Sequence, residues 1–308
     1  MKSGKAFQGG RVSLSTVSLH ASGAILAVLL SCSAQATGTL EKVAKSGVLT
    51  IGYQLSPPFS YADENQRPIG YTVDICAKII EAIKREIKRP DLAVKYKQVN
   101  TDSRFPSLID GDIDMECGNT TNTAERRKKV AFTIPTFIAA TRLLVRADSG
   151  IKSIYNLAGK TVVATKGSSG DKIFTDLNST RTLRANLEFT KESDEAFALV
   201  DTGKADAFIM DDILLYSLRA SAKDPEKFEV TRDALTIEPL SIMLRKDDPA
   251  FKKVIDTEVT RIIVQGEIYP IYRKWFESPI PPKQLNLKLP MVFMLRDSFK
   301  TPTDWIPN

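Results

Sequence analysis

The chain has 308 residues, of which 43% are hydrophobic and 26% are charged, and its formal net charge is +6 at pH 7. This length suits two domains, and the composition is that of a globular protein that can bury a core in each. Its single histidine is His20. Catalysis by Ser-His-Asp or Cys-His groups, histidine general-base chemistry and His-ligated metal sites all need histidines. The composition therefore argues against most hydrolase and metalloenzyme functions.

Residues 1–36 have the pattern of an export signal. Three basic residues precede the apolar run Ala21–Leu30, and Ala34-Gln35-Ala36 fits an A-x-A cleavage site. A run of about ten residues is too short to span a bilayer, and no later apolar segment is long enough either. We therefore expect a soluble protein that reaches the periplasm by a cleavable signal peptide.

A lipoprotein anchor is the alternative at this end. Leu29-Leu30-Ser31-Cys32 resembles a lipoprotein box that would acylate Cys32, although Leu30 fits the pattern poorly.

Cleavage after Ala36 would remove three basic residues and no acidic one, so the net charge would fall from +6 to +3. The densest basic run, Arg126–Lys129, is typical of a solvated helix face, and nucleic-acid binding is not expected.

The remaining elements alternate between short apolar strands and helical patterns, which predicts an α/β fold. In chain order we expect strand Val48–Tyr53, a helix that Thr72 can cap, strand Val94–Val99, helix Phe105–Ile109, strand Ile113–Cys117, strands Thr141–Arg146 and Thr161–Thr165, helix Lys191–Thr202, strand Ala207–Met210, strand Ser241–Leu244 and a helix from Pro249 to Gly266. The segment after Pro279 is Pro-rich and irregular until Met291–Leu295.

Two details of these elements bear on packing. The helix after Thr72 carries Ile75, Ile79, Ile83 and Ile87 at a spacing of four residues, which predicts one buried stripe. Cys76 lies on this helix and can pair with Cys117 in an oxidising compartment. Sequence spacing fixes no geometry for the pair, and two buried free thiols are the simpler interpretation.

The order of motifs along the chain resembles the periplasmic amino-acid-binding proteins of ABC importers, extracellular solute-binding protein family 3, and within them the glutamate/aspartate-binding branch. The segments that carry the resemblance are Gly52-Tyr53, Pro58–Tyr61, Gly70-Tyr71 with Asp74, Gly111–Asp114, Glu116–Asn122, Glu125-Arg126, Thr141–Leu144, Ala207–Asp212, Leu244–Pro249, Lys274–Phe276 and Pro279–Lys283. Together they cover essentially all of the chain after the signal.

This resemblance implies a two-lobed periplasmic-binding-protein type II fold, with a ligand cleft between the lobes. Lobe 1 would comprise residues 37–138 plus 240–278, lobe 2 residues 139–239, and residues 279–308 would form a tail that packs on lobe 1. Two hinge strands would cross between the lobes, near Ile138–Ala140 and near Glu238–Ser241.

The resemblance also implies a binding site for a free amino acid. The ligand carboxylate needs a bidentate Arg and backbone N–H donors, and Arg126 matches the family's carboxylate clamp. The loop Gly167–Gly170, with Ser168 and Ser169, precedes a helical segment and can meet the same anion. The alternatives are a surface charge for Arg126 and an ordinary turn for the loop.

The ligand ammonium needs an anion, and Asp211 matches the family carboxylate that receives it. Asp212 is the alternative inward-facing carboxylate, and both residues can instead cap the next helix. Asn119 and Thr121 follow a strand end and are expected to donate or accept hydrogen bonds. Tyr53 and Ser56 are candidate walls of the side-chain pocket, with ordinary loop packing as the alternative.

The ligand side chain is less well defined, because three positions depart from the branch. Gln54 replaces an Arg, Asn119 replaces a Ser, and Ser193 replaces a His. Arg142 remains as a group that could neutralise a side-chain carboxylate, unless it is paired within the protein. Glutamate and aspartate rank first, and amide and small polar amino acids remain compatible with these residues.

The function that the resemblance implies is a binding component, without cofactor or metal, that works as a monomer. Hinge closure around the ligand would produce the form recognised by a membrane permease and its ATPase. The chain has no phosphate-binding P-loop of its own. The alternatives are a periplasmic lyase on the same fold, similar to cyclohexadienyl dehydratase, and a sensor that presents the loaded state to a receptor.

Overall fold

The computed structural model describes residues 38–306. The predicted signal peptide, His20 and the alternative anchor at Cys32 lie outside these residues. Among the described helices, none is both long and apolar enough to cross a membrane.

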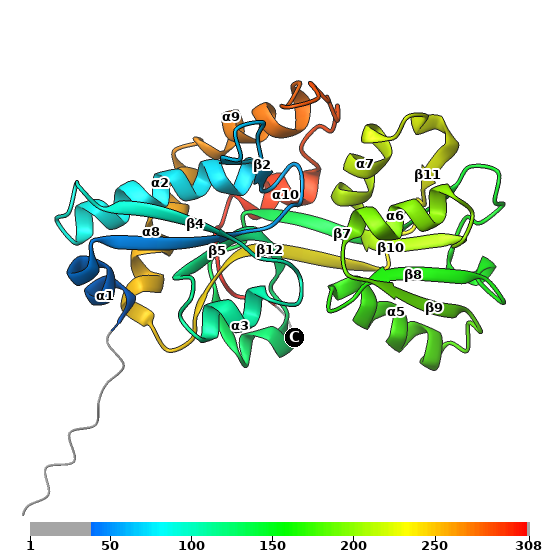
Figure 1. The fold of residues 1–308 in the computed structure, drawn as a ribbon, viewed down its shortest axis with the longest axis horizontal. Helices are drawn as coiled ribbons and strands as arrows, with labels where there is room; N and C mark the ends of the chain where they lie inside the picture. Colours follow the sequence, from blue (N-terminus) through cyan, green and yellow to red (C-terminus); the bar gives the residue numbers. More distant parts are fainter. Residues whose placement is uncertain (1–37, 307–308) are drawn as a thin grey trace, which may run out of the picture. The chain divides into compact units, whose positions relative to one another are not determined.

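One large mixed sheet organises the described chain (Figure 1). Its strands run in the order β4-β1-β5-β12-β7-β10-β8-β9, with β6 added beside β12 and β11 beside β7. The strands are β1 (Val48–Tyr53), β4 (Ala93–Gln98), β5 (Met115–Thr121), β6 (Val130–Phe132), β7 (Phe137–Arg146), β8 (Thr161–Thr165), β9 (Asn186–Thr190), β10 (Ala207–Asp211), β11 (Phe228–Val230) and β12 (Thr236–Arg245). A separate small hairpin pairs β2 (Tyr61–Ala62) with β3 (Pro68–Ile69).

Helices are associated with both ends of the sheet. The α-helices are α1 (Thr39–Ser46), α2 (Tyr71–Glu86), α3 (Arg104–Ile109), α4 (Ala124–Arg127), α5 (Ser169–Thr180), α6 (Ser193–Asp201), α7 (Asp212–Ser221), α8 (Pro249–Val264), α9 (Ile268–Tyr272) and α10 (Phe293–Ser298), with single turns at Ile154–Asn156, Pro225–Lys227 and Arg273–Glu277. Helix α2 packs on β5 and on α8, whereas α5 and α6 pack on β8 and β10 (Figure 1). The predicted α/β class is confirmed.

The long strands β7 and β12 join the two ends of the sheet. They pair in antiparallel register from Thr236 opposite Thr141 to Leu240 opposite Phe137. The two hinge strands were expected from the sequence within these segments. Each strand is longer than predicted, because the residues at the crossing itself, such as Glu238 and Pro239, are not a typical strand sequence.

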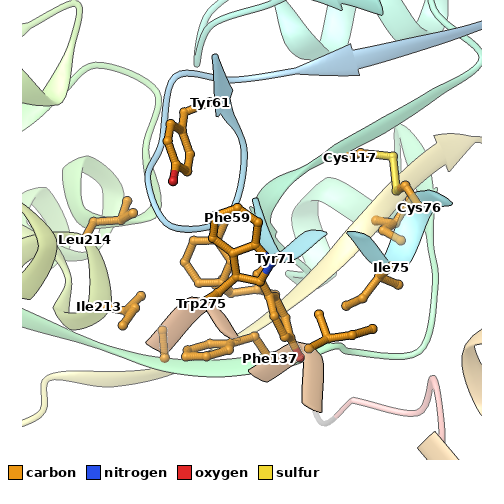
Figure 2. Close-up of a cluster of buried hydrophobic side chains, with 14 of the residues drawn as sticks. Phe59, Tyr61, Tyr71, Ile75, Cys76, Cys117, Phe137, Ile213, Leu214 and Trp275 are labelled. Atoms are coloured by element: carbon orange, nitrogen blue, oxygen red, sulfur yellow. A yellow bond between two sulfur atoms is a disulfide. The ribbon is translucent and has the colours of Figure 1, made fainter. Parts of the chain in front are cut away.

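A cluster of aromatic side chains fixes the start of β7 (Figure 2). The ring of Phe137 lies 5.0 Å from those of Phe59 and Phe276, and the Tyr71 hydroxyl donates to the Thr136 carbonyl at 2.7 Å. The same buried cluster extends to Leu214 on α7. Because the cluster includes residues from loops, helices and β7, it holds the strand in one orientation.

Helix α2 confirms the predicted isoleucine stripe for Ile75, Ile79 and Ile83, which are fully buried, whereas Ile87 lies just after the helix and is only partly buried. Two further details differ from prediction. Thr72 is not the cap, because the helix begins at Tyr71 after Gly70, and Thr72 is buried in its first turn. Cys76 and Cys117 form a disulfide bond, so the free-thiol interpretation is wrong.

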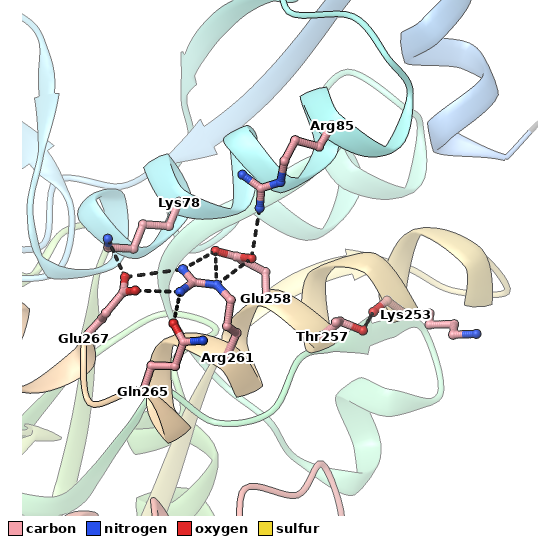
Figure 3. Close-up of polar contacts among 8 residues, drawn as sticks. All are labelled: Lys78, Arg85, Lys253, Thr257, Glu258, Arg261, Gln265 and Glu267. Atoms are coloured by element: carbon pink, nitrogen blue, oxygen red, sulfur yellow. Dashed lines mark hydrogen bonds and ion pairs between the residues drawn. The ribbon is translucent and has the colours of Figure 1, made fainter.

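The outer faces of α2 and α8 are joined by ion pairs (Figure 3). Glu258 on α8 accepts from Arg85 on α2 at 3.3 Å and from Arg261 on its own helix at 2.7 Å. Glu267, after α8, pairs with Lys78 at 2.6 Å. Glu258 is buried and its carboxylate is satisfied by both arginines, so these contacts link α8 to α2. The Lys78–Glu267 pair is more exposed, and such pairs contribute little to stability.

We expect the disulfide to be a measurable source of stability, because it joins α2 to the strand that ends in the predicted site. The double variant Cys76→Ala/Cys117→Ala should lose about 2–4 kcal/mol of unfolding free energy. Urea unfolding of the oxidised wild type, the reduced wild type and the variant would measure this. Equal midpoints for the oxidised and reduced wild-type proteins would contradict it.

Candidate functional site

A cavity of about 230 Å³ lies at the strand ends beside the β7–β12 pair. Most of the site residues that the sequence singled out line it: Gln54, Asn119, Thr121, Arg126, Ser168, Ser169, Ser193 and Asp211. Ser56 lines it as well. Residues far apart in the sequence thus meet in one concave site, as expected for a small-molecule pocket.

Arg126 extends into this cavity from the short helix α4. The Thr123 side chain caps that helix by accepting from the Arg126 amide at 3.2 Å, which fixes where the side chain starts. The guanidinium donates to the carbonyls of Thr121 at 3.0 Å and Gly167 at 3.2 Å. In the described part of the chain no carboxylate forms an ion pair with it, so its charge is available to an anion.

Burial is the main influence on this charge. Burial, followed by the positive charge of nearby Arg104, lowers the pKa of Arg126 to about 10. The group remains protonated at neutral pH. A desolvated guanidinium without an ion-paired carboxylate favours binding of a planar carboxylate.

Asp211 ends β10 and is the second charged group of the cavity. Asp211 is 2% exposed, and within residues 38–306 its Oδ1 atom is buried without a hydrogen-bond partner. Burial, followed by the charges of Glu238 and Asp212, raises the pKa of Asp211 to about 8, against the opposing effect of Arg126 and Arg104. A buried carboxylate without a partner is a receptor for a cation.

The serine loop contributes hydroxyls at the start of α5. Ser168 is the N-cap and accepts from the Asp171 amide at 3.1 Å, while the Ser169 hydroxyl lies 3.5 Å from that of Thr121 across the cavity. The Gly167 amide already donates to Asp171 at 3.0 Å. The helix N-terminus therefore adds partial positive charge to the cavity, with Gly167 itself occupied.

Arg104, on α3, is a cavity residue that the sequence analysis missed. It donates to the Thr120 hydroxyl at 2.8 Å, and that hydroxyl donates to Glu116 at 2.8 Å. The signal was present in Glu116, a charged residue within the fully buried strand β5. A buried carboxylate needs a nearby positive charge or hydrogen-bond donors, and Arg104 supplies the charge here.

Gln54 completes this buried polar chain. Its side-chain amide donates to Glu116 at 2.9 Å and to the Asn119 side chain at 3.4 Å. Gly118 makes room for the contact, because a Cβ atom there would lie 1.9 Å from the Glu116 carboxylate. Gln54 and Asn119 are therefore tied to one network that ends at the cavity wall.

Two predicted site residues do not reach the cavity. Tyr53 packs edge-on against Tyr96, with ring centroids 6.4 Å apart. Arg142 pairs with Asp212 at 3.2 Å and donates to the Thr231 carbonyl at 3.1 Å. We therefore correct the expectation that Arg142 neutralises a ligand side chain. Because side chains alternate along a strand, Thr141 faces the Asp211 side of β7 and Arg142 faces away.

The same contacts separate the roles of the two adjacent aspartates. Asp212 accepts from the Ala140 amide at 3.1 Å and holds Arg142, so it serves the structure around β7. Asp211 alone of the two lines the cavity.

No group of three or more His, Cys, Asp or Glu side chains in the described residues is placed to hold a metal ion.

Curated relatives match nearly the whole chain. The L-glutamate/L-aspartate-binding protein of Pseudomonas aeruginosa is 41% identical over 288 residues, covering 92% of this chain and 95% of that protein. The glutamate/aspartate import solute-binding protein of Escherichia coli K12 is 39% identical over 290 residues, covering 91% and 96%.

Solved structures share the fold. An ancestral arginine-binding protein bound to arginine superposes with a TM-score of 0.67 and 26% identity, covering 75% of this chain and 98% of that one. An ancestral amino-acid-binding protein, a precursor of cyclohexadienyl dehydratase, gives 0.66 and 26%, covering 78% and 100%. Residues 49–278 match the bacterial extracellular solute-binding proteins, family 3. The chain therefore belongs to family 3 of the bacterial extracellular solute-binding proteins.

Proposed function

We propose that this protein is the solute-binding component of an ABC importer and that it binds a polar L-amino acid, with glutamate and aspartate ranked first. One observation carries the proposal: Arg126 and Asp211 face the same cavity, and neither forms an ion pair within the described chain. A free amino acid presents a carboxylate and an ammonium at fixed separation. It supplies the partner that each of these charges lacks.

Arg104, Gln54, Asn119 and Ser193 would surround the ligand side chain. Arg104 adds a second positive charge beside the cavity, which favours an acidic side chain. Its charge is partly balanced by Glu116 through Thr120, and the amide groups of Gln54 and Asn119 also suit a glutamine side chain. The names of the two relatives, both glutamate/aspartate-binding proteins, support ranking glutamate and aspartate first.

Ligand capture would proceed by closure of two lobes about β7 and β12, with lobe 1 at residues 37–138 plus 240–278 and lobe 2 at residues 139–239. Contacts already cross the cavity between these segments, from Arg126 to Gly167 and from Thr121 to Ser169. A ligand held by groups from both segments favours the closed state. Residues 279–308 would stay with lobe 1, since the Tyr61 hydroxyl donates to the Pro281 carbonyl at 2.6 Å.

The remaining parts of the proposal follow from the family. The protein would be exported by removal of residues 1–36, act in the periplasm as a monomer, and deliver its ligand to a permease with its ATPase. It would not be an enzyme.

The second candidate is a lyase, because a cleft carboxyl that keeps its proton near neutral pH can serve as a general acid, and burial raises the pKa of Asp211 to about 8. Ligand released unchanged from the purified protein would exclude the lyase.

Loss of the Arg126 guanidinium should remove the carboxylate clamp. The variant Arg126→Ala is expected to weaken binding of L-glutamate by about 2–5 kcal/mol, measured by isothermal titration calorimetry. The matched control is Arg127→Ala, whose guanidinium donates to the Asn122 side chain at 3.0 Å instead of lining the cavity. Wild-type affinity in Arg126→Ala would refute the site assignment.

The buried Asp211 carboxyl group should lower the unfolding free energy of the ligand-free protein. Between about pH 4 and pH 8 the unfolded carboxyl ionises while the folded one keeps its proton, so unfolding free energy falls as pH rises. Asp211→Asn should therefore stabilise the ligand-free protein at pH 8, on the order of 1–3 kcal/mol, and abolish amino-acid binding. Thermal unfolding at pH 4 and pH 8 would measure this, and a variant equally or less stable at pH 8 would contradict it.

Residue 54 should tune selectivity. Gln54→Arg places a cation next to Glu116 and Asn119 and is expected to raise the ratio of the Kd for L-glutamine to that for L-glutamate about tenfold. Calorimetric titration with both amino acids would provide the ratio. An unchanged ratio would mean that residue 54 does not influence the ligand side chain.

A further inference from the structure

Glu238, on the crossing strand β12, is a buried carboxylate that the proposed binding mode does not use. Its side chain is 4% exposed, one oxygen accepts from the Thr236 hydroxyl, and the other has no partner in residues 38–306. No Lys or Arg of the described chain forms an ion pair with it. Such a group is costly to bury, so its position calls for an explanation.

The strand register brings Glu238 near Asp211. Thr141 on β7 lies opposite Asp211 on one side and opposite Thr236 on the other. Residues opposite each other in paired strands, and residues two apart along one strand, share a face of the sheet. Asp211, Thr141, Thr236 and Glu238 therefore lie on one face, and the Thr236 and Thr141 hydroxyls, 3.0 Å apart, stand between the two carboxylates.

The other charged groups around the pair do not neutralise it by direct contact. They are Asp212 on α7, Arg126 on α4, Arg104 on α3, Glu116 on β5, and Glu192 and Asp194 at the start of α6. Asp212 is occupied by Arg142, and Arg126 donates to two carbonyls. When one of two nearby buried carboxyl groups is ionised, its charge disfavours ionisation of the other.

We propose that ligand binding is coupled to release of one proton from Asp211, and that Glu238 is the positioning residue that sets this coupling without touching the ligand. The inference rests on the proposed function, because the ligand must carry an ammonium. In the empty site Asp211 carries a proton. When the ammonium arrives, the Asp211 O–H bond breaks, its electron pair stays on the carboxylate, and the proton leaves to solvent. The ligand keeps its own ammonium protons.

The burial of Asp211 and the negative charge of Glu238 account for the protonated state, since both raise the pKa of Asp211, to about 8. Below that pH the proton competes with the ligand. Affinity should therefore increase as pH rises, by up to about tenfold per pH unit, and the dependence should level off above about pH 8.

The test is calorimetric titration of the ligand-free protein with L-glutamate at pH 7, in two buffers of different ionisation enthalpy. The difference in heat gives the number of protons released, which should be close to one for the wild type. Glu238→Gln should bind L-glutamate but release clearly fewer protons, and Glu238→Asp, which restores a carboxylate, should recover the release. Glu229→Gln, on β11 and paired with Lys152, is the matched control and should behave as the wild type.

Four results would overturn the proposal, and they are distinguishable. L-Glutamate binding with the same heat in both buffers would refute the proton coupling. Full release in Glu238→Gln would refute the role of Glu238. If Glu238→Gln does not fold, as judged by circular dichroism, the wild-type Kd between pH 6 and pH 9 decides the coupling, and a flat profile refutes it. Absence of binding by any amino acid would instead refute the proposed function, and this inference with it.

Discussion

The Arg126 guanidinium and the Asp211 carboxyl group line one cavity without ion pairs of their own; Asp211 is buried and Arg126 is partly buried. Folding normally avoids this arrangement, because each desolvated charge costs free energy that only a partner offsets. The surrounding structure keeps the two apart. Arg126 is fixed by a capped helix and two carbonyls, and Asp211 by its place at the end of β10. The unsatisfied pair defines the ligand as one that carries both a carboxylate and an ammonium.

The scaffold explains how groups from distant parts of the chain reach this cavity. Strands β7 and β12 run side by side between the two ends of the sheet (Figure 1), and the aromatic cluster around Phe137 anchors one of them (Figure 2). The disulfide holds α2 to β5, whose end carries Asn119 and Thr121. A few paired strands connecting two packed regions suit a hinge, since small backbone rotations there move whole regions.

The sequence predicted many of the elements and about half of the residues that line the cavity, but not the buried electrostatics. Strand β1, the isoleucines of α2 and the start of α8 at Pro249 follow from local pattern, and the structure agrees. Arg104 was missed because nothing in its neighbours distinguishes it from a surface arginine. Arg142 was misplaced because its direction depends on strand alternation and on Asp212. The role of Glu238 could not be predicted from the sequence, because it depends on the strand register that places Glu238 on the same face as Asp211.

A structure of the protein crystallised with L-glutamate would test the central claim most directly. The account predicts the α-carboxylate on the Arg126 guanidinium and the ammonium on the Asp211 carboxylate, with the side chain toward Arg104. A ligand bound with its ammonium away from Asp211, or bound outside this cavity, would contradict it.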